Sequence, residues 1–319
     1  MSRKYCLLCL VLTIMYSNCF GITDQMIIRE TLKGTDYNIE TGKRNTSWEC
    51  PDDYSFDTTV YEGVPLEILK KNNAVNVDKV VLMLHGGGYV GAMNDHYNDF
   101  MLNYSKASNG ATIIAPDYRV ARDDPCYMSQ GQVYAPAFED AILSYEYILS
   151  QGYASENIIV GGDSAGGGLA IALTMYLRDH DMRLPKAVMG MSAWTNLTLS
   201  SASYTERKGD DPIFGANGVL QKCAQMYAGQ VNPSYVYISP YYGEYYDFPS
   251  MYLTVGTREM LYNDTVDVIQ KARQAGVDVT EHIYEGMIHD CQSFGDLIPE
   301  AQDAWNDVRN FFDSIWSNK

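Results

Sequence analysis

The chain has 319 residues, of which 46% are hydrophobic and 12% are aromatic. A chain of this length and composition can bury a large core in one domain, which excludes an intrinsically disordered protein. Acidic residues outnumber basic ones by 40 to 23, and this net charge of -17, spread along the chain, argues against nucleic acid or an anionic membrane surface as a partner.

The N-terminal residues have the pattern of a secretory signal peptide. Arg3 and Lys4 precede an uncharged, mostly apolar run, and small or polar residues follow it. This order predicts cleavage between Cys19 and Ile22, and therefore a signal peptide over residues 1–21. The run is too short for a comfortable membrane span, so no integral span is expected after cleavage. The predicted location is secreted or in the secretory-pathway lumen, and the alternative is tethering by an uncleaved signal anchor.

Cysteines and glycosylation sequons in the remaining chain agree with export. The cysteines are Cys50, Cys126, Cys223 and Cys291. Four cysteines allow two disulfides in any of three pairings, and free buried thiols are the alternative. Sequons of the form N-x-S/T occur at Asn45, Asn103, Asn196 and Asn263. They predict a glycoprotein wherever the asparagine is exposed and the cell performs this chemistry.

From residue 59 onward, strand patterns alternate with helix patterns. Strands are expected at residues 59–69, 79–84, 112–115, 186–192, 250–255 and 279–284. Helices are expected at residues 95–108, 136–149, 219–227, 263–275 and 300–314, and residues 157–177 read as strand, tight turn and helix. This alternation predicts an α/β fold whose mostly parallel sheet is covered by helices on both faces. No repeat or linker divides residues 22–319, so we expect one domain.

The stretch of residues 157–177 places a serine where a strand ends and a helix begins. Ser164 has Gly162 two positions before it and Gly166 two positions after it. A serine at the point of such a turn needs small neighbours, and its hydroxyl then stands above the N-terminus of the helix. A Gly-x-Ser-x-Gly string also arises by chance, but the flanking strand and helix favour a nucleophile.

A serine nucleophile needs a base, and histidine is the usual one. His85, His96, His180 and His282 each have an adequate structural role in a turn, at a helix end or within a strand. His289 differs because it lies in the loop after the last expected strand. Ligands of parallel α/β sheets bind at the carboxyl ends of the strands, so we predict that His289 is the base.

The acid that orients the base should follow another late strand. Glu259 is the first carboxylate after the strand expected at residues 250–255, whereas Asp264 lies further along, at the start of a helix. An acid at that position is already explained by the helix dipole, so Glu259 is favoured over Asp264. Ser164, Glu259 and His289 then occur in the chain order of α/β-hydrolase triads.

The glycine-rich stretch at residues 86–91 allows two interpretations. It matches G-x-G-x-x-G after a strand, and Asp117 ends the next strand, as in a dinucleotide site. However, the following helix is expected to begin only after Asn94, so no helix terminus would meet a pyrophosphate.

An oxyanion hole is the stronger account of these glycines. Without side chains, Gly87 and Gly88 can bring backbone amides close to a carbonyl oxygen, and the amide of Ala165 would join them. Such donors stabilise the negative charge that develops when a serine attacks an ester. No metal or cofactor is needed for this chemistry.

Together these motifs resemble the hormone-sensitive-lipase family of α/β-hydrolases from about residue 77 to the end. They are His85-Gly-Gly-Gly88, Asp117-Tyr-Arg119, Phe138-Glu-Asp140, Gly162-Asp-Ser-Ala-Gly-Gly167, Trp194-Thr-Asn-Leu-Thr-Leu199, Ser239-Pro240 and Gly286-Met-Ile-His289. The resemblance implies an α/β-hydrolase fold and a serine carboxylesterase or lipase that uses Ser164, Glu259 and His289. It also implies a helical lid from about residues 22–57 and 200–232. Family members commonly have Asp as the acid, and Glu is a known variant.

Three features depart from the family pattern. Asn196 stands where the family often has Asp, and it creates a sequon close to the expected lid. The loop at residues 119–136 is longer than in relatives and contains Cys126, which a disulfide could pin. Residues 22–57 match too poorly for lid residues to be assigned there.

We therefore predict hydrolysis of a small-molecule ester or lipid substrate through an acyl-enzyme on Ser164. The alternative is a non-catalytic ligand-binding or receptor protein on the same fold. Receptors that resemble this family keep the serine but lack the histidine, so His289 disfavours that alternative. Amide hydrolysis would use the same residues. The acyl chain and the alcohol depend on the lid, and the sequence leaves them and the oligomeric state open.

Overall fold

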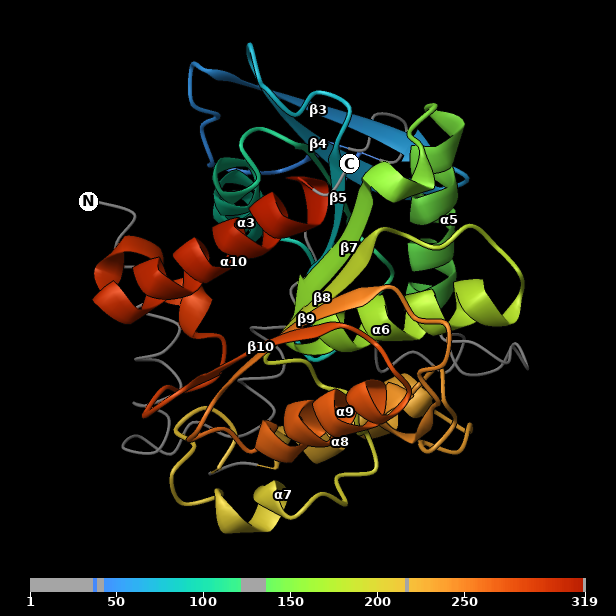
Figure 1. Ribbon diagram of the computed structural model, residues 1–319, viewed down its shortest axis with the longest axis vertical. Helices are drawn as coiled ribbons and strands as arrows, with labels where there is room; N and C mark the ends of the chain where they lie inside the picture. The colour runs from blue at the N-terminus through green and yellow to red at the C-terminus, as the bar shows by residue number, and fades with distance from the viewer. Residues whose placement is uncertain (1–36, 39–42, 122–135, 216–217, 318–319) are drawn as a thin grey trace.

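The computed structural model describes residues 37–38, 43–121, 136–215 and 218–317 (Figure 1). The strands are β1 (Tyr37–Asn38), β2 (Lys43–Arg44), β3 (Tyr54–Tyr61), β4 (Val64–Lys71), β5 (Val80–Leu84), β6 (Thr112–Pro116), β7 (Ile158–Asp163), β8 (Ala187–Met191), β9 (Ser250–Gly256) and β10 (Val279–Tyr284). The α-helices are α3 (Asp95–Ala107), α5 (Pro136–Ser150), α6 (Ser164–Asp179), α7 (Ser203–Glu206), α8 (Val219–Ala228), α9 (Tyr262–Gln274) and α10 (Pro299–Ser317). Short 3-10 helices are η1 (Ser155–Asn157), η2 (Pro240–Tyr242) and η3 (Cys291–Leu297).

One mostly parallel sheet organises the fold. Its eight strands follow the order β10-β9-β8-β7-β5-β6-β4-β3. Only β4 runs antiparallel to its neighbours, β3 and β6, and the other pairings are parallel. The predicted α/β-hydrolase fold is confirmed. Parallel pairing also places the carboxyl ends of β5, β7, β8, β9 and β10 along one edge, where the site forms.

The N-terminal part of the sheet differs from expectation. The single strand expected at residues 59–69 is a hairpin of two strands, β3 and β4, with its turn at Glu62 and Gly63. Both turn residues have positive φ, 49° and 86°, as a tight two-residue hairpin requires. Residues 54–57, at the end of the segment expected to contribute to the lid, pair with β4 as part of the edge strand β3.

Two layers of helices cover the sheet, because the buried strands are apolar on both faces. Along β5, Val80, Leu82 and Leu84 pack into one core cluster, and Val81 and Met83 pack into the other. The first cluster includes residues of α5, α6 and α9, and the second includes residues of α3 and α10. In Figure 1, α3 and α10 accordingly lie on one side of the sheet, and α5 and α6 lie on the other.

Several expectations fall on residues that the structure does not describe. These are the signal peptide at residues 1–21, most of the expected lid at residues 22–57, and Cys126 in the loop after Arg119. Cys50, Cys223 and Cys291 are free thiols, so they form no disulfide with one another. Within the described ranges, no helix is at once long and apolar enough to cross a bilayer.

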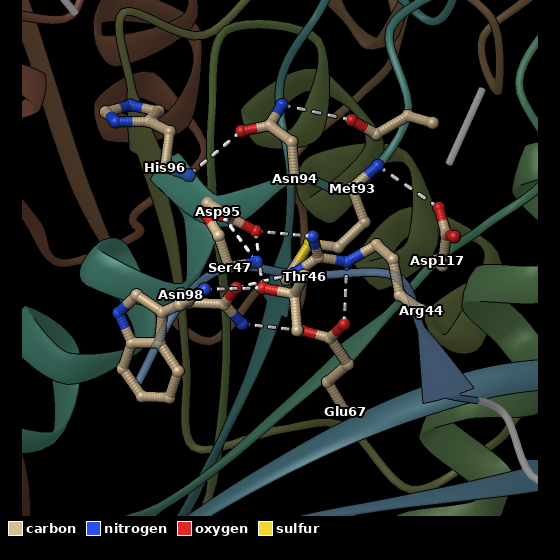
Figure 2. Close-up of polar contacts among 12 residues, drawn as sticks. Arg44, Thr46, Ser47, Glu67, Met93, Asn94, Asp95, His96, Asn98 and Asp117 are labelled. Atoms are coloured by element: carbon tan, nitrogen blue, oxygen red, sulfur yellow. Dashed lines mark hydrogen bonds and ion pairs between the residues drawn. The ribbon is translucent and has the colours of Figure 1, made fainter. Parts of the chain in front are cut away.

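A buried arginine fastens the segment around β2 to the domain (Figure 2). Only 2% of the Arg44 side chain is exposed. Its guanidinium donates to Glu67 of β4 (2.9 Å), and to Asp95 (2.9 Å) and Asn98 (2.5 Å) of α3. Asn98 also donates to the second oxygen of Glu67 at 2.7 Å. Every polar group of this buried cluster therefore has a partner, as burial of charge demands.

The same segment caps the first turn of α3. Thr46 donates to Asp95 through its hydroxyl at 2.5 Å, and Ser47 donates through its hydroxyl at 2.7 Å and its amide at 3.1 Å. Burial opposes ionisation of Asp95, but the hydrogen bonds from Thr46, Ser47 and Arg44 outweigh it and lower the pKa to about 2. Residues 44–47 are therefore held by an ionised carboxylate at the positive end of a helix dipole.

We expect Arg44→Ala to lower the free energy of unfolding by about 3–5 kcal/mol, because it leaves the buried carboxylate of Glu67 without its cation. Urea unfolding followed by circular dichroism measures this loss. Arg273→Ala is the matched control, because Arg273 pairs with Glu281 at 3.0 Å where the two side chains are 47% and 35% exposed. Arg273→Ala should lower the free energy of unfolding by less than about 1 kcal/mol. Equal decreases for both variants would contradict the stabilising role of Arg44.

Candidate active site

The turn that joins β7 to α6 is sterically crowded and carries Ser164. This serine has a φ of +51°, a conformation that costs free energy for a residue with a side chain. A Cβ at Gly162 would lie 2.4 Å from the carbonyl oxygen of Leu84, and a Cβ at Gly166 would lie 2.0 Å from the same oxygen. Because the backbone of β5 passes this close, only glycine fits at either position. The turn thus sets Ser164 at the N-terminus of α6.

A histidine links this serine to a carboxylate. Nε2 of His289 lies 2.9 Å from Oγ of Ser164, and Nδ1 lies 2.9 Å from Oε2 of Glu259. The three residues are 8%, 6% and 0% exposed, respectively. They come from the turns after β10, β7 and β9, which meet at one edge of the sheet. Ser164 and Glu259, which lie 125 and 30 positions before His289 in the sequence, are therefore brought within hydrogen-bonding reach of it.

Two further donors fix the carboxylate of Glu259. Its Oε1 accepts from the hydroxyl of Ser192 at 2.7 Å and from the amide of Gly256 at 2.5 Å. Burial raises the pKa of Glu259, while the hydrogen bond and charge of His289 oppose this increase. With one oxygen held by these donors, the other is left to orient the imidazole.

The rival acid, Asp264, is used elsewhere. It accepts hydrogen bonds from the amide of Asn196 (3.0 Å), the hydroxyl of Ser201 (3.0 Å) and the phenol of Tyr204 (2.8 Å). Burial raises its pKa to about 8, although these donors oppose the shift. Asp264 therefore ties the start of α9 to the segment that leads into α7. The geometry places Glu259, and not Asp264, against His289.

The charge state of His289 is governed by competing effects. Burial alone would lower its pKa, because a charged ring loses its hydration. The carboxylates of Asp290 and Glu259 outweigh burial and raise the pKa of His289 well above its ordinary value. The imidazolium that forms when a serine is deprotonated is therefore strongly stabilised here.

The glycine-rich turn after β5 lies against the serine turn. Gly87 and Gly88 have φ values of +100° and +63°, and Tyr89 follows with +63°. The carbonyl of Gly87 accepts from the amides of Val90 (3.1 Å) and Gly91 (2.8 Å), which closes a tight loop. A Cβ on Gly87 would lie 3.1 Å from the backbone of Gly91, so glycine is needed for this close approach.

Asp163, the residue before the serine, pins this loop in place. Its Oδ1 accepts from the amide of Gly86 at 3.2 Å, and its Oδ2 accepts from the phenol of Tyr97 at 3.2 Å. Burial raises the pKa of Asp163 well above its ordinary value, and the nearby Asp290 adds to this effect. The glycine loop and the serine turn are thereby held as one unit.

The dinucleotide interpretation of the glycines fails on geometry (Figure 2). Helix α3 begins at Asp95 and is capped by Asn94, whose side chain accepts from the amide of His96. The helix therefore starts four residues after Gly91, beyond reach of a phosphate on the glycine loop. Asp117, the residue in the position of a ribose-binding acid, accepts from the amide of Met93 at 3.1 Å and is buried.

The other histidines have the structural roles expected of them. His85 stacks on Tyr118 with ring centroids 3.9 Å apart, and burial lowers its pKa to about 4, so it is neutral. His96 lies in the first turn of α3, and His180 caps the C-terminus of α6. His282 lies within β10. Within the described ranges, no three His, Cys, Asp or Glu side chains gather in a way that could hold a metal ion.

The segment between α7 and α8 covers the histidine. The ring of Phe214 meets the imidazole of His289 edge to face, with centroids 4.6 Å apart. Asp211 holds this segment, because its Oδ1 accepts from the amides of Ile213 (2.8 Å) and Phe214 (3.0 Å). Its Oδ2 accepts from the amide of Met260 at 2.8 Å, next to Glu259. One buried carboxylate thus joins the cover to the turn that carries the acid.

Helix α8 covers the glycine loop. Tyr227 stacks on Tyr89 with centroids 3.7 Å apart, and a Cβ on Gly88 would lie 3.3 Å from Sγ of Cys223. Part of the segment expected to form the lid, residues 200–232, therefore packs against the glycine loop at Gly88 and Tyr89.

Sequence reasoning missed the residues that support the trio. Ser192 directly follows β8 and, like Ser164, has a positive φ, +47°. Its position was a signal that could have identified it, because Ser192 is a polar residue at the carboxyl end of an expected strand, 186–192. Asp211 and Phe214 carry no comparable local signal, because their roles depend on how the cover packs.

Comparisons with known proteins agree with this geometry. A family model described as alpha/beta hydrolase fold matches residues 81–293. An acetyl-hydrolase of Streptomyces hygroscopicus is 30% identical over 227 residues, which span 71% of this chain and 72% of the relative. An esterase of Acinetobacter venetianus is 27% identical over 238 residues, spanning 74% and 75%. The solved structure of an esterase from the bacterial hormone-sensitive lipase family superposes with a TM-score of 0.79 at 29% identity, covering 98% of each chain.

Proposed function

The chain belongs to the hormone-sensitive-lipase family of α/β hydrolases and is an ester-cleaving serine hydrolase, and from this premise we propose that Ser164, His289 and Glu259 form its catalytic triad. The observation that carries the proposal is the row of two 2.9 Å contacts that joins the three side chains. The family's name and fold alone would leave the choice of acid open.

In the first half of the reaction, Oγ of Ser164 attacks the carbonyl carbon of the ester while its proton passes to Nε2 of His289. Glu259 accepts a hydrogen bond from the Nδ1–H group of His289 and so stabilises the imidazolium. The carbonyl oxygen becomes an oxyanion, to which the amides of Gly87, Gly88 and Ala165 donate. The tetrahedral intermediate then expels the alcohol, which takes the proton from Nε2.

In the second half, water attacks the acyl group on Ser164 and gives a proton to His289. Collapse of the new intermediate releases the carboxylic acid, and the proton on Nε2 returns to Oγ. The substrate is thus a small-molecule carboxylic ester, and no metal or cofactor enters either half. The names of the relatives, acetyl-hydrolase and esterase, support this substrate class.

Ser164→Ala should abolish hydrolysis of a p-nitrophenyl ester, because it removes the atom that forms the acyl bond. A spectrophotometric assay of p-nitrophenol release measures the loss, which should reach about 10⁴-fold or more. Mass spectrometry should also show one organophosphonate adduct per chain in the wild type and none in the variant. Retained turnover in Ser164→Ala would refute the assignment.

Glu259→Gln should lower kcat by about 10²–10⁴-fold, because a neutral amide no longer stabilises the imidazolium. Asp264→Asn is the matched control: it also replaces one buried carboxyl group by an amide, at the start of the next helix, but leaves the contact between Glu259 and His289 intact. Its kcat should stay within about tenfold of the wild type, because the hydrogen bonds that Asp264 accepts come from Asn196, Ser201 and Tyr204 and involve no member of the triad. A larger loss in Asp264→Asn than in Glu259→Gln would reverse the choice of acid.

We also propose that the protein enters the secretory pathway through the signal peptide at residues 1–21 and is glycosylated. The exposure of the sequons supports Asn45 as the acceptor, because its side chain lies at the surface. Asn196 is fully buried, and its amide donates to Ser201 at 2.9 Å. A sugar chain on Asn196 has no room in the folded chain.

Secretion from a eukaryotic host tests both parts of this proposal. The protein should appear in the medium and lose mass on treatment with a peptide N-glycosidase. Asn45→Gln should remove the glycan that this site carries, whereas Asn196→Gln should leave the electrophoretic mobility unchanged. Retention of the full-length chain in the cell, or a shift caused by Asn196→Gln alone, would contradict the proposal.

A further inference from the structure

The residue after the catalytic histidine has an unusual backbone and a fixed position. Asp290 has φ and ψ values of 51° and 52°, in the left-handed region. Its amide donates to the hydroxyl of Ser192 at 3.1 Å, and that hydroxyl donates to Glu259 at 2.7 Å. The network that holds the catalytic acid therefore also holds the backbone of Asp290.

This backbone turns the Asp290 carboxylate toward the reacting atoms. Oδ2 lies 3.0 Å from Nε2 of His289, the nitrogen that also lies 2.9 Å from Oγ of Ser164. The Asp290 side chain is 13% exposed. Its Oδ1 is buried and has no hydrogen-bond partner within the described part of the chain. The imidazole thus stands between two carboxylates, with Glu259 at Nδ1 and Asp290 at Nε2.

The two protonation states of the ring interact differently with this pair. A neutral imidazole that donates from Nδ1 to Glu259 presents a lone pair at Nε2, and a lone pair repels the oxygen of Asp290. An imidazolium has a proton on each nitrogen and donates to both carboxylates. The arrangement favours the charged ring, and a charged ring cannot accept the proton of Ser164.

Other titratable groups interact with Asp290 or with His289. Asp163, at the end of β7, interacts electrostatically with His289, and burial raises the pKa of that carboxyl, which reduces its charge. On α3, burial lowers the pKa of His96 and raises that of Tyr97, so both are uncharged near neutral pH. Burial likewise raises the pKa of Cys291 and keeps its thiol protonated. The two carboxylates in direct contact with the ring therefore dominate its charge state.

We propose that Asp290 is a positioning residue that holds the protonated form of His289 through Nε2 and so raises the pH at which Ser164 becomes active. This inference rests on the proposed catalytic roles of Ser164 and His289. The same contact stabilises the imidazolium after the serine has attacked. Asp290 therefore lowers activity at low pH but stabilises the reaction intermediate at high pH.

The test is the pH dependence of kcat/KM for a p-nitrophenyl ester in the wild type, Asp290→Asn and Asp290→Gly. Asparagine and glycine both tolerate the left-handed conformation, so neither variant strains the backbone. Both remove the charge beside Nε2, and the acidic limb of the profile should move down by about one pH unit or more. One unit below the wild-type midpoint, activity relative to each enzyme's plateau should rise about fivefold.

Asp296→Asn is the matched control, because Asp296 is an exposed carboxylate within η3, the short helix that Asp290 caps. Its profile should coincide with that of the wild type, which separates contact with the ring from the effect of net charge. Unchanged midpoints in both Asp290 variants, or an equal shift in Asp296→Asn, would overturn the inference.

The pH dependence of organophosphonate labelling gives a second readout that needs no turnover. The labelling rate should show the same midpoint shift in the Asp290 variants as kcat/KM. A wild type that is not labelled at any pH would refute the nucleophilic role of Ser164. Normal labelling with a midpoint unaffected by Asp290 would refute only the present inference.

Discussion

The site depends on the close approach of two backbones, that of β5 at Leu84 and that of the turn around Ser164. Side chains at Gly162 or Gly166 would lie within 2.4 Å of the Leu84 carbonyl oxygen. This contact brings the glycine loop, which continues from β5, next to the serine. A hydroxyl and a set of backbone amides thus meet without any flexible side chain between them, which favours preorganised stabilisation of an oxyanion.

The parallel sheet supplies the remaining groups. Strands β7, β8, β9 and β10 end at the same edge, and each is followed by one polar residue of the network: Ser164, Ser192, Glu259 and His289. Each of these residues lies in the turn that follows its strand, and β7, β8 and β9 are almost wholly buried. The sheet therefore holds the reacting atoms in place, while Phe214 packs against His289 and helix α8 packs against the glycine loop.

Much of this arrangement could be predicted from the sequence, because its determinants are local. The glycines at positions 162 and 166 reveal the tight turn that Ser164 needs. Position directly after a late strand favoured Glu259 over Asp264 as the acid. The hairpin turn at Glu62 and Gly63 was missed because a non-glycine residue with positive φ leaves a weak pattern. The roles of Asp211 and Asp290 could not be foreseen, since both depend on which groups the folded chain brings beside them.

The carboxylate of Asp211 connects the surroundings of the base to those of the acid. It accepts hydrogen bonds from the amides of Ile213 and Phe214 on one side and from the amide of Met260 on the other. The ring of Phe214 packs against His289, and Met260 directly follows Glu259. The backbone beside each residue therefore shares one anchor, so a shift of either segment would break hydrogen bonds to the same buried side chain.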